Sequence, residues 1–250
     1  MAVETHPSSN PVAPSGAGGW IVADAGLRLI AAILLAFVAV VTAMTVAGFN
    51  VDLAVARLFS APGVLHFPLA IDTTVTTLRD RGFVAGIVCA GCVLLAILGY
   101  VPGHWPSIPA RAAAYLTTAY LLGPGLLVNG ILKSHWGRPR PNEVIDFGGA
   151  LPFVNWWDMH GACPANCSFI SGEAAAAAWL FGPAMLAPRR WRPLTISLAA
   201  AFFVMTSGLR MAAGGHFLTD VAIGGLSSVL VLLLLRPLFY PKTIRPDALA

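Results

Sequence analysis

The sequence contains few charged residues. Only 10% of its 250 residues are Asp, Glu, Lys or Arg, whereas 57% are hydrophobic and the mean hydropathy is +0.77. A soluble domain carries about 25% charged residues, so this composition excludes an ordinary soluble domain and predicts an integral membrane protein. The net charge is +4, and its arginines flank apolar segments. This placement favours contact with anionic lipid headgroups over binding of nucleic acid.

Residues 1–19 lack the features of a secretory signal peptide. Such a peptide needs a positively charged start followed by an early apolar run. The segment is instead rich in Pro, Ser, Gly and Ala, and it is expected to be a disordered tail. Residues 20–240 are expected to form a single membrane domain, and residues 241–250 a short cytoplasmic tail.

Six apolar segments are candidates for crossing a bilayer, which takes about 20 residues in a helix. They cover residues 26–49, 82–101, 110–132, 172–186, 194–212 and 216–235. The expected fold class is therefore all-α, a polytopic bundle of about six transmembrane helices. The fourth segment is short, and Gly123-Pro124-Gly125 is expected to kink the third. Residues 50–81 indicate either an interfacial amphipathic helix or an ordinary structured loop.

Basic residues predict the orientation of these segments. Arg189, Arg190 and Arg192 lie in one short turn between the fourth and fifth segments and mark that turn as cytoplasmic. Both termini are then cytoplasmic, and the polar loop of residues 133–171 lies on the outer side. That loop carries three basic residues of its own, which are interpreted as functional.

The four cysteines form two pairs. Cys89 and Cys92 have the spacing of a redox pair, but the bilayer lacks the polar setting that a reactive thiol needs, so both are interpreted as packing residues. Cys163 and Cys167 lie in the outer loop, where an oxidising compartment favours a local disulfide. A metal site is the alternative, although no well-spaced Cys/His set accompanies them.

Three polar clusters stand at the outer ends of the predicted helices. They are Lys133-x6-Arg140-Pro141, Cys167-Ser-Phe-Ile-Ser171-Gly172-Glu173 and Arg210-x5-His216-x3-Asp220. Insertion into a membrane gathers them at one face, where charged residues are usually functional. If His216 begins a helix, Asp220 lies one turn later and can bind one imidazole nitrogen, leaving the other as a base or nucleophile. A capping histidine with a buried aspartate partner is the structural alternative.

In this order the three clusters resemble those of the type 2 phosphatidic acid phosphatase superfamily, the lipid phosphate phosphatases related to vanadium haloperoxidases. The resemblance implies a lipid phosphate monoesterase that needs no metal or other cofactor. It implies that His216 attacks phosphorus and forms a phosphohistidine, with Asp220 fixing its tautomer. The implied phosphate-binding residues are Lys133, Arg140, Ser171, the Gly172 N–H and Arg210. Arg138 has no role in the family pattern and is interpreted as a headgroup contact.

Two positions depart from the family pattern. Glu173 stands where the family usually has the histidine that protonates the leaving oxygen, so it is either the general acid or an ionised positioning residue. Leu209 stands where serine usually precedes the arginine. Three features resemble a subgroup of bacterial lipid A 4′-phosphatases. They are the Cys-Ser-Phe-x-Ser-Gly-Glu form, the preceding Cys163 and the Gly-Arg-x-Arg-Pro turn. This implies a substrate on the periplasmic leaflet of an inner membrane.

Other substrates and other classes of protein stay open. Phosphatidylglycerophosphate, phosphatidic acid and undecaprenyl diphosphate are alternative substrates, because contacts to tails and headgroups are not encoded in the motifs. The alternative classes are a transporter with a buried anion site and a phosphate-binding protein that has lost catalysis. A transporter predicts ionisable groups along the midplane and repeated halves, and neither is present. The lipid substrate is the expected partner, and the oligomeric state is not predicted.

Overall fold

The computed structural model describes residues 17–61, 67–74, 76–77 and 110–240. Within these residues the fold is helical, with one isolated bridge between Val144 and Leu151 and no named strand. The all-α prediction is therefore confirmed. The predicted second span, with Cys89 and Cys92, lies outside the described residues.

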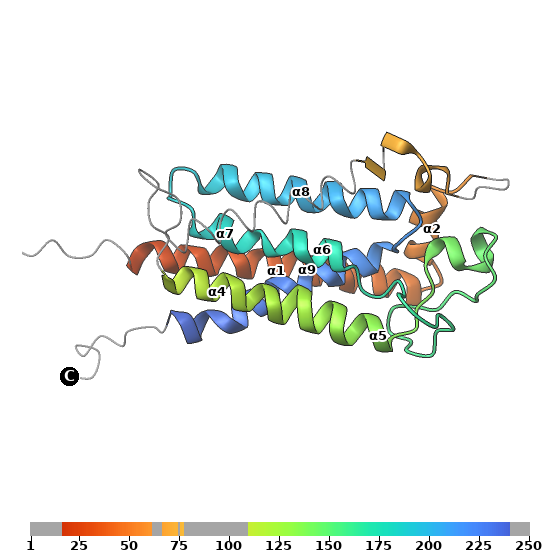
Figure 1. Ribbon diagram of the computed structural model, residues 1–250, viewed down its shortest axis with the longest axis horizontal. Helices are drawn as coiled ribbons and strands as arrows, with labels where there is room; N and C mark the ends of the chain where they lie inside the picture. Colours follow the sequence, from red (N-terminus) through yellow and green to blue (C-terminus); the bar gives the residue numbers. More distant parts are fainter. Residues whose placement is uncertain (1–16, 62–66, 75, 78–109, 241–250) are drawn as a thin grey trace, which may run out of the picture.

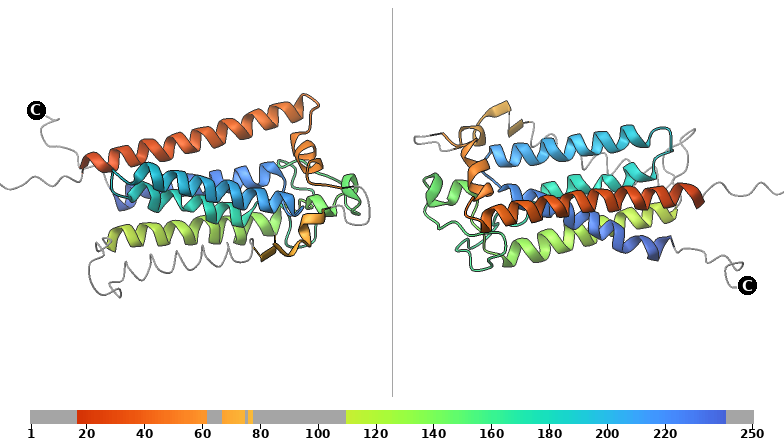
Figure 2. Two further views of the ribbon diagram at one scale, coloured as in Figure 1. Left: turned by 90° about the horizontal axis from the view of Figure 1, so that it is seen from above. Right: turned by 180° about the vertical axis from the view of Figure 1, so that it is seen from behind.

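Helices of different lengths run side by side along the molecule (Figure 1). They are α1 (Ala17–Val46), α4 (Ala110–Tyr120), α6 (Gly172–Trp179), α7 (Phe181–Leu186), α8 (Arg192–Ala212) and α9 (Leu218–Phe239). The short α2 (Val51–Arg57) and the loops that follow α5 (Lys133–His135) gather at one end of the bundle. The start of α1 and the end of α9 lie at the opposite end, as both views of Figure 2 also show. Single 3₁₀ turns cover Pro68–Ala70, Pro141–Glu143 and Ile145–Phe147.

Four of the described helical stretches are long and apolar enough to cross a membrane. They are Asp24–Val46, Arg111–His135, Arg192–Ala212 and Leu218–Phe239. These agree with the first, third, fifth and sixth predicted spans to within a few residues. The total of six spans stays a prediction. Residues 17–19, which the sequence placed in a disordered tail, belong to the first turn of α1.

The fourth predicted span is two short helices rather than one. Helix α6 ends at Trp179 and α7 begins at Phe181. Pro183 explains the break, because it has no N–H to donate to the carbonyl of Trp179 and its ring clashes with the preceding turn. The third span changes in a different way. It continues from α4 through Leu121–Leu132 in wider π-helical turns that contain Pro124, and Asn129 Nδ2 donates to the Pro124 carbonyl at 2.7 Å.

Helix α9 is the centre of the bundle. In its most apolar stretch 56% of the residues are buried inside the protein, against 17% for α1 and 11% for α8. It packs on α1, α4 and α6. Gly224 permits close contact with the start of α6, since a Cβ at this position would lie 2.7 Å from the Ser171 carbonyl oxygen. The first turns of α6 and α9 are thereby brought together, and both carry predicted site residues.

Candidate active site

His216 lies two residues before α9 and is buried, with 2% of its surface exposed. Its Nδ1 lies 2.7 Å from the carbonyl oxygen of Ser168. A carbonyl can only accept a hydrogen bond, so Nδ1 carries the proton and Nε2 keeps its lone pair. Nε2 faces Nη2 of Arg210 at 3.4 Å. This is the tautomer that a nucleophilic Nε2 requires.

Asp220 does not bind His216, so the prediction of a direct contact is wrong. Helix α9 begins after His216, and Asp220 lies in its first turn. One carboxylate oxygen of Asp220 accepts from Phe217 N–H at 2.8 Å and from Ser168 Oγ at 2.5 Å. Asp220 therefore caps the helix and positions the residue whose carbonyl fixes the His216 tautomer.

Burial and positive charge keep His216 neutral. Burial has the largest effect, and the charges of Arg210, Lys133 and Arg140 follow, so that the pKa of His216 lies well below its ordinary value of 6.5. The bond to Ser168 acts in the opposite direction and is the weakest of these causes. These cations belong to two of the sequence clusters, Lys133 and Arg140 to the first and Arg210 to the third. A neutral imidazole with its lone pair on Nε2 has the chemistry of a base or a nucleophile.

Glu173 pairs with Arg210. Its Oε2 lies 3.3 Å from Arg210 Nε, across the gap between the first turn of α6 and the last turn of α8. Both side chains are largely shielded from solvent, with 28% and 11% of their surfaces exposed. The pair turns the guanidinium so that Nη2 faces His216. This geometry favours the positioning role of Glu173 over that of a proton donor.

The start of α6 provides backbone N–H groups beside these cations. Ser171 is buried and is the N-cap of α6, and its hydroxyl accepts from Ala174 N–H at 3.3 Å. The Ser171 hydroxyl is thus used by the helix, while Gly172 lies in the first turn, where N–H groups have no partner within the helix. Such a helix start binds anions readily.

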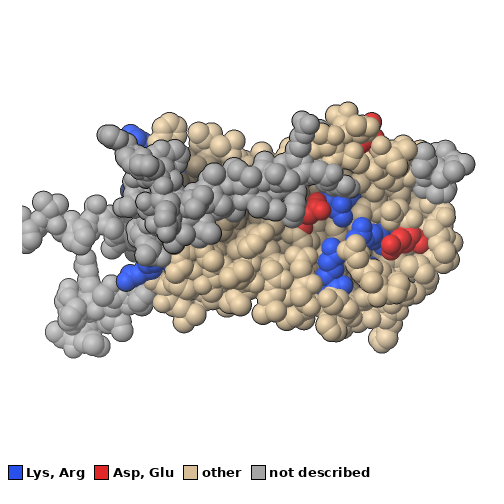
Figure 3. Space-filling view, in the orientation of Figure 1, with Lys and Arg blue, Asp and Glu red and all other residues tan. Residues whose placement is uncertain are grey.

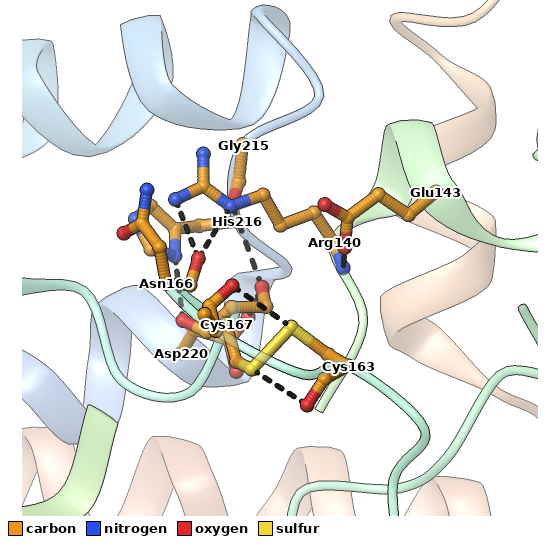
Figure 4. Close-up of a disulfide and its surroundings, with 10 residues drawn as sticks. Arg140, Glu143, Cys163, Asn166, Cys167, Gly215, His216 and Asp220 are labelled. Carbon is orange, nitrogen blue, oxygen red and sulfur yellow. Dashed lines mark hydrogen bonds between the residues drawn. A yellow bond between two sulfur atoms is a disulfide. The ribbon is translucent and has the colours of Figure 1, made fainter. Parts of the chain in front are cut away.

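Arg140 extends over the loop that Cys163 and Cys167 close (Figure 4). The two cysteines form a disulfide with Cα atoms 5.7 Å apart. Arg140 donates from Nε and Nη2 to the carbonyl of Asn166, at 3.0 and 2.7 Å. The disulfide loop therefore anchors a predicted phosphate-binding residue. Among the described residues, no three His, Cys, Asp or Glu side chains gather as a metal-binding group.

Arg138 is fully buried, so its interpretation as a headgroup contact is wrong. Its backbone follows a turn at Gly137, where φ is +66° and a Cβ would lie 2.5 Å from the Gly161 carbonyl oxygen. Burial acts to lower the pKa of Arg138, but the carboxylates of Asp220 and Asp52 raise it above its ordinary value. The guanidinium therefore stays charged inside the protein.

Sequence reasoning missed two residues of the site. Ser168 supplies the carbonyl for His216, and Asp52, in α2, is buried with 4% exposure and binds Arg138. A signal for Asp52 was present, because it is an acid within an apolar segment and such a group needs a partner. The partner itself could not be named, since it lies 86 residues away.

The surface of the bundle agrees with a membrane setting. In the face drawn in Figure 3, the visible charged side chains of described residues lie toward the two ends, and the described residues visible between them are uncharged. One end combines Lys or Arg with Asp or Glu side chains. The site lies at the end of the bundle where α8 ends and α9 begins (Figure 1).

Curated relatives share about half of their length with this chain. A lipid A 4′-phosphatase of Rhizobium etli is 50% identical over 113 residues, which cover 45% of this chain and 44% of that protein. A protein of the same name from Rhizobium leguminosarum is 47% identical over 131 residues, covering 51% and 56%. Another, from Francisella tularensis subsp. novicida, is 36% identical over 133 residues, covering 53% and 60%. No solved structure matches the chain.

The relatives are bacterial, and together with the apolar helices they indicate a multi-pass bacterial membrane protein. The family model that matches the chain covers residues 112–244, which include all three sequence clusters, His216 and the whole of α9. This is more than half of the chain, and on that match it belongs to the PAP2 superfamily.

Proposed function

We propose that this chain hydrolyses a phosphate monoester on a lipid headgroup through a phosphohistidine at His216. The observation that carries the proposal is the pair of contacts made by the imidazole. Nδ1 donates to the Ser168 carbonyl, and Nε2 faces Arg210 among three cations. A histidine that only capped a helix would not need its second nitrogen directed into a cationic site.

The reaction has two steps. Nε2 attacks phosphorus, the phosphorus–oxygen ester bond breaks, and the lipid alcohol leaves after taking a proton from water. The hydroxide left by that proton transfer then attacks phosphorus, the phosphorus–nitrogen bond breaks, and inorganic phosphate leaves His216 neutral with its Nδ1 proton in place. Lys133, Arg140 and Arg210 offset the charge on the phosphoryl oxygens in both steps, which is the role that a divalent metal has in other phosphotransferases.

The proposed substrate is the 4′-phosphate of lipid A. Three relatives at 36–50% identity carry that name, and the chain spans about half of their length. The location of the site at one end of the bundle suits a phosphate carried at the bilayer surface.

The assay that tests this proposal presents the purified protein with lipid A, phosphatidic acid, phosphatidylglycerophosphate and undecaprenyl diphosphate in the presence of a chelator. We expect release of phosphate from lipid A, a product that keeps its 1-phosphate, and inhibition by vanadate, which mimics five-coordinate phosphorus. Faster turnover of another lipid would change the proposed substrate to that lipid and leave the proposed reaction unchanged. Activity that is lost with chelator and restored by magnesium would exclude the metal-independent mechanism.

We further propose that the site faces the periplasm from the inner membrane. The start of α1, the end of α9 and the basic turn before α8 lie at one end of the bundle, and the site lies at the other (Figure 1). The basic turn, with Arg189 and Arg190, favours the cytoplasmic side.

Reporter fusions provide the test of orientation. Alkaline phosphatase, which is active only in the periplasm, is expected to be active when fused within residues 142–155 and inactive when fused after residue 193. Green fluorescent protein is expected to give the reverse pattern. If both reporters place each fusion site on the side opposite to the one expected, the proposed orientation is wrong.

A further inference from the structure

Arg138 joins two carboxylates from distant parts of the chain. Its Nη2 donates to Asp52 Oδ2 at 2.7 Å, and its Nη1 donates to Asp220 Oδ1 at 2.5 Å. Its guanidinium also lies 4.5 Å from the centroid of the Phe217 ring. All four side chains are buried, and a buried charge is stable only when it is paired. Arg138 therefore depends on both carboxylates, and each carboxylate depends on Arg138.

Asp52 also binds the first turn of α9. Its Oδ1 accepts from Thr219 N–H at 2.9 Å, and its Oδ2 accepts from Thr219 Oγ1 at 2.6 Å. The Thr219 hydroxyl accepts in turn from Arg138 Nη1 at 2.9 Å. A carboxylate at this place is favourable because a helix N-terminus attracts negative charge. Asp52 thus fixes α9 at the turn that carries Asp220. It lies outside residues 112–244, which the family model matches.

A continuous set of hydrogen bonds leads from this network to His216. Asp220 accepts from the hydroxyl of Ser168 at 2.5 Å, and the carbonyl of Ser168 accepts from Nδ1 of His216 at 2.7 Å. The residue that fixes the tautomer and direction of the imidazole is therefore held by Asp220. Asp220 is held in turn by Arg138.

We propose that Asp52 and Arg138 are positioning residues for the reaction. Asp52 fixes Arg138 and the first turn of α9, these fix Asp220 and Ser168, and Ser168 aims His216 Nε2 at phosphorus. The inference rests on the proposed phosphohistidine chemistry. Asp52 is not one of the residues proposed to bind the phosphate of the substrate. Its loss should therefore lower kcat and leave KM unchanged.

The test compares Asp52→Asn with wild type in single turnover on a labelled lipid phosphate. Active sites are counted from the total phosphoenzyme that can be trapped, so that rates refer to folded sites alone. We expect the rate of phosphoenzyme formation per site to fall by about tenfold to a hundredfold, since small misplacement of a reacting group has effects of this size. KM should stay within about twofold. Asp146→Asn, which removes an exposed carboxylate, should match wild type.

Thr219→Val and Thr219→Ser are a second pair of variants that change the network less than Asp52→Asn does. They provide the test if Asp52→Asn does not fold. Valine removes the hydroxyl between Asp52 and Arg138 while all three charges remain, and it should slow phosphoenzyme formation per site. Serine keeps the hydroxyl and should restore most of the rate.

The outcomes separate this inference from the proposed function. A wild-type protein that forms no phosphoenzyme on any lipid overturns the proposed function. If the wild type is active, and Asp52→Asn has fewer active sites but an unchanged rate per site, only the positioning role is overturned. The same conclusion follows if Thr219→Val and Thr219→Ser react equally fast.

Discussion

Replacing His216 with alanine is expected to lower turnover by at least about four orders of magnitude, as loss of a nucleophile does in other covalent catalysts. The reason is that Nε2 is the atom that bonds to phosphorus, and its Nδ1–H is already fixed by the Ser168 carbonyl. Wild-type protein given a lipid with labelled phosphate should carry label after an alkaline quench, and His216→Ala should carry none.

The matched control for this variant is His160→Ala. His160 lies in the loop between α5 and α6 with 95% of its side chain exposed, and its Nδ1 lies 3.0 Å from Asp158 Oδ1. It should behave as wild type in turnover and in labelling. Label that persists in His216→Ala, or turnover within tenfold of wild type, would rule out His216 as the nucleophile.

Replacing Arg210 with alanine is expected to lower kcat/KM by about 10²–10³, which is the usual effect of removing one group that stabilises developing negative charge. Arg210 is placed for this role because its Nη2 faces His216 Nε2 and its Nε faces Glu173. Arg210→Lys keeps the charge but loses the planar fork, so it should give an intermediate rate. Steady-state kinetics on one lipid substrate measure both variants, and equal rates for alanine and wild type would contradict the assignment.

Glu173 provides the companion measurement to Arg210. If it positions Arg210, Glu173→Gln and Glu173→Ala should slow hydrolysis by the same factor for good and poor leaving groups. If Glu173 were the general acid, the loss would be large for a poor leaving group and small for an activated one. The ion pair at 3.3 Å leads us to expect equal losses.

The sequence was sufficient to predict that its polar clusters meet. Each cluster stands at an end of an apolar segment. When consecutive helices cross a bilayer in opposite directions, the end of one helix and the start of the next lie at the same face. Arg210 of the third cluster pairs with Glu173 of the second at 3.3 Å, and His216 binds the carbonyl of Ser168 at 2.7 Å, in agreement with this expectation. Helix boundaries were also close, because Arg192 and Pro193 begin α8 and Gly214, with φ at +65°, ends it just after Ala212.

Contacts between distant residues could not be predicted in the same way. The i to i+4 spacing suggested that Asp220 binds His216, but this holds only if both belong to one helix. Helix α9 begins after His216, so the carboxylate turns to Ser168 and Arg138 instead. The role of Arg138 depends on Asp52, and that contact depends on how α2 packs against α9. No local pattern encodes such a pairing.

The carbonyl that anchors Arg140 belongs to Asn166, inside the ring closed by Cys163 and Cys167. Disulfides form in oxidising compartments and rarely in the cytosol. If the site faces the periplasm, as proposed, a copy inserted in the opposite orientation would carry every motif residue, yet its Cys163–Cys167 ring would stay open on the reducing side. Arg140 would then be anchored less firmly in the misinserted copies. Such copies would dephosphorylate lipids of the wrong leaflet less efficiently.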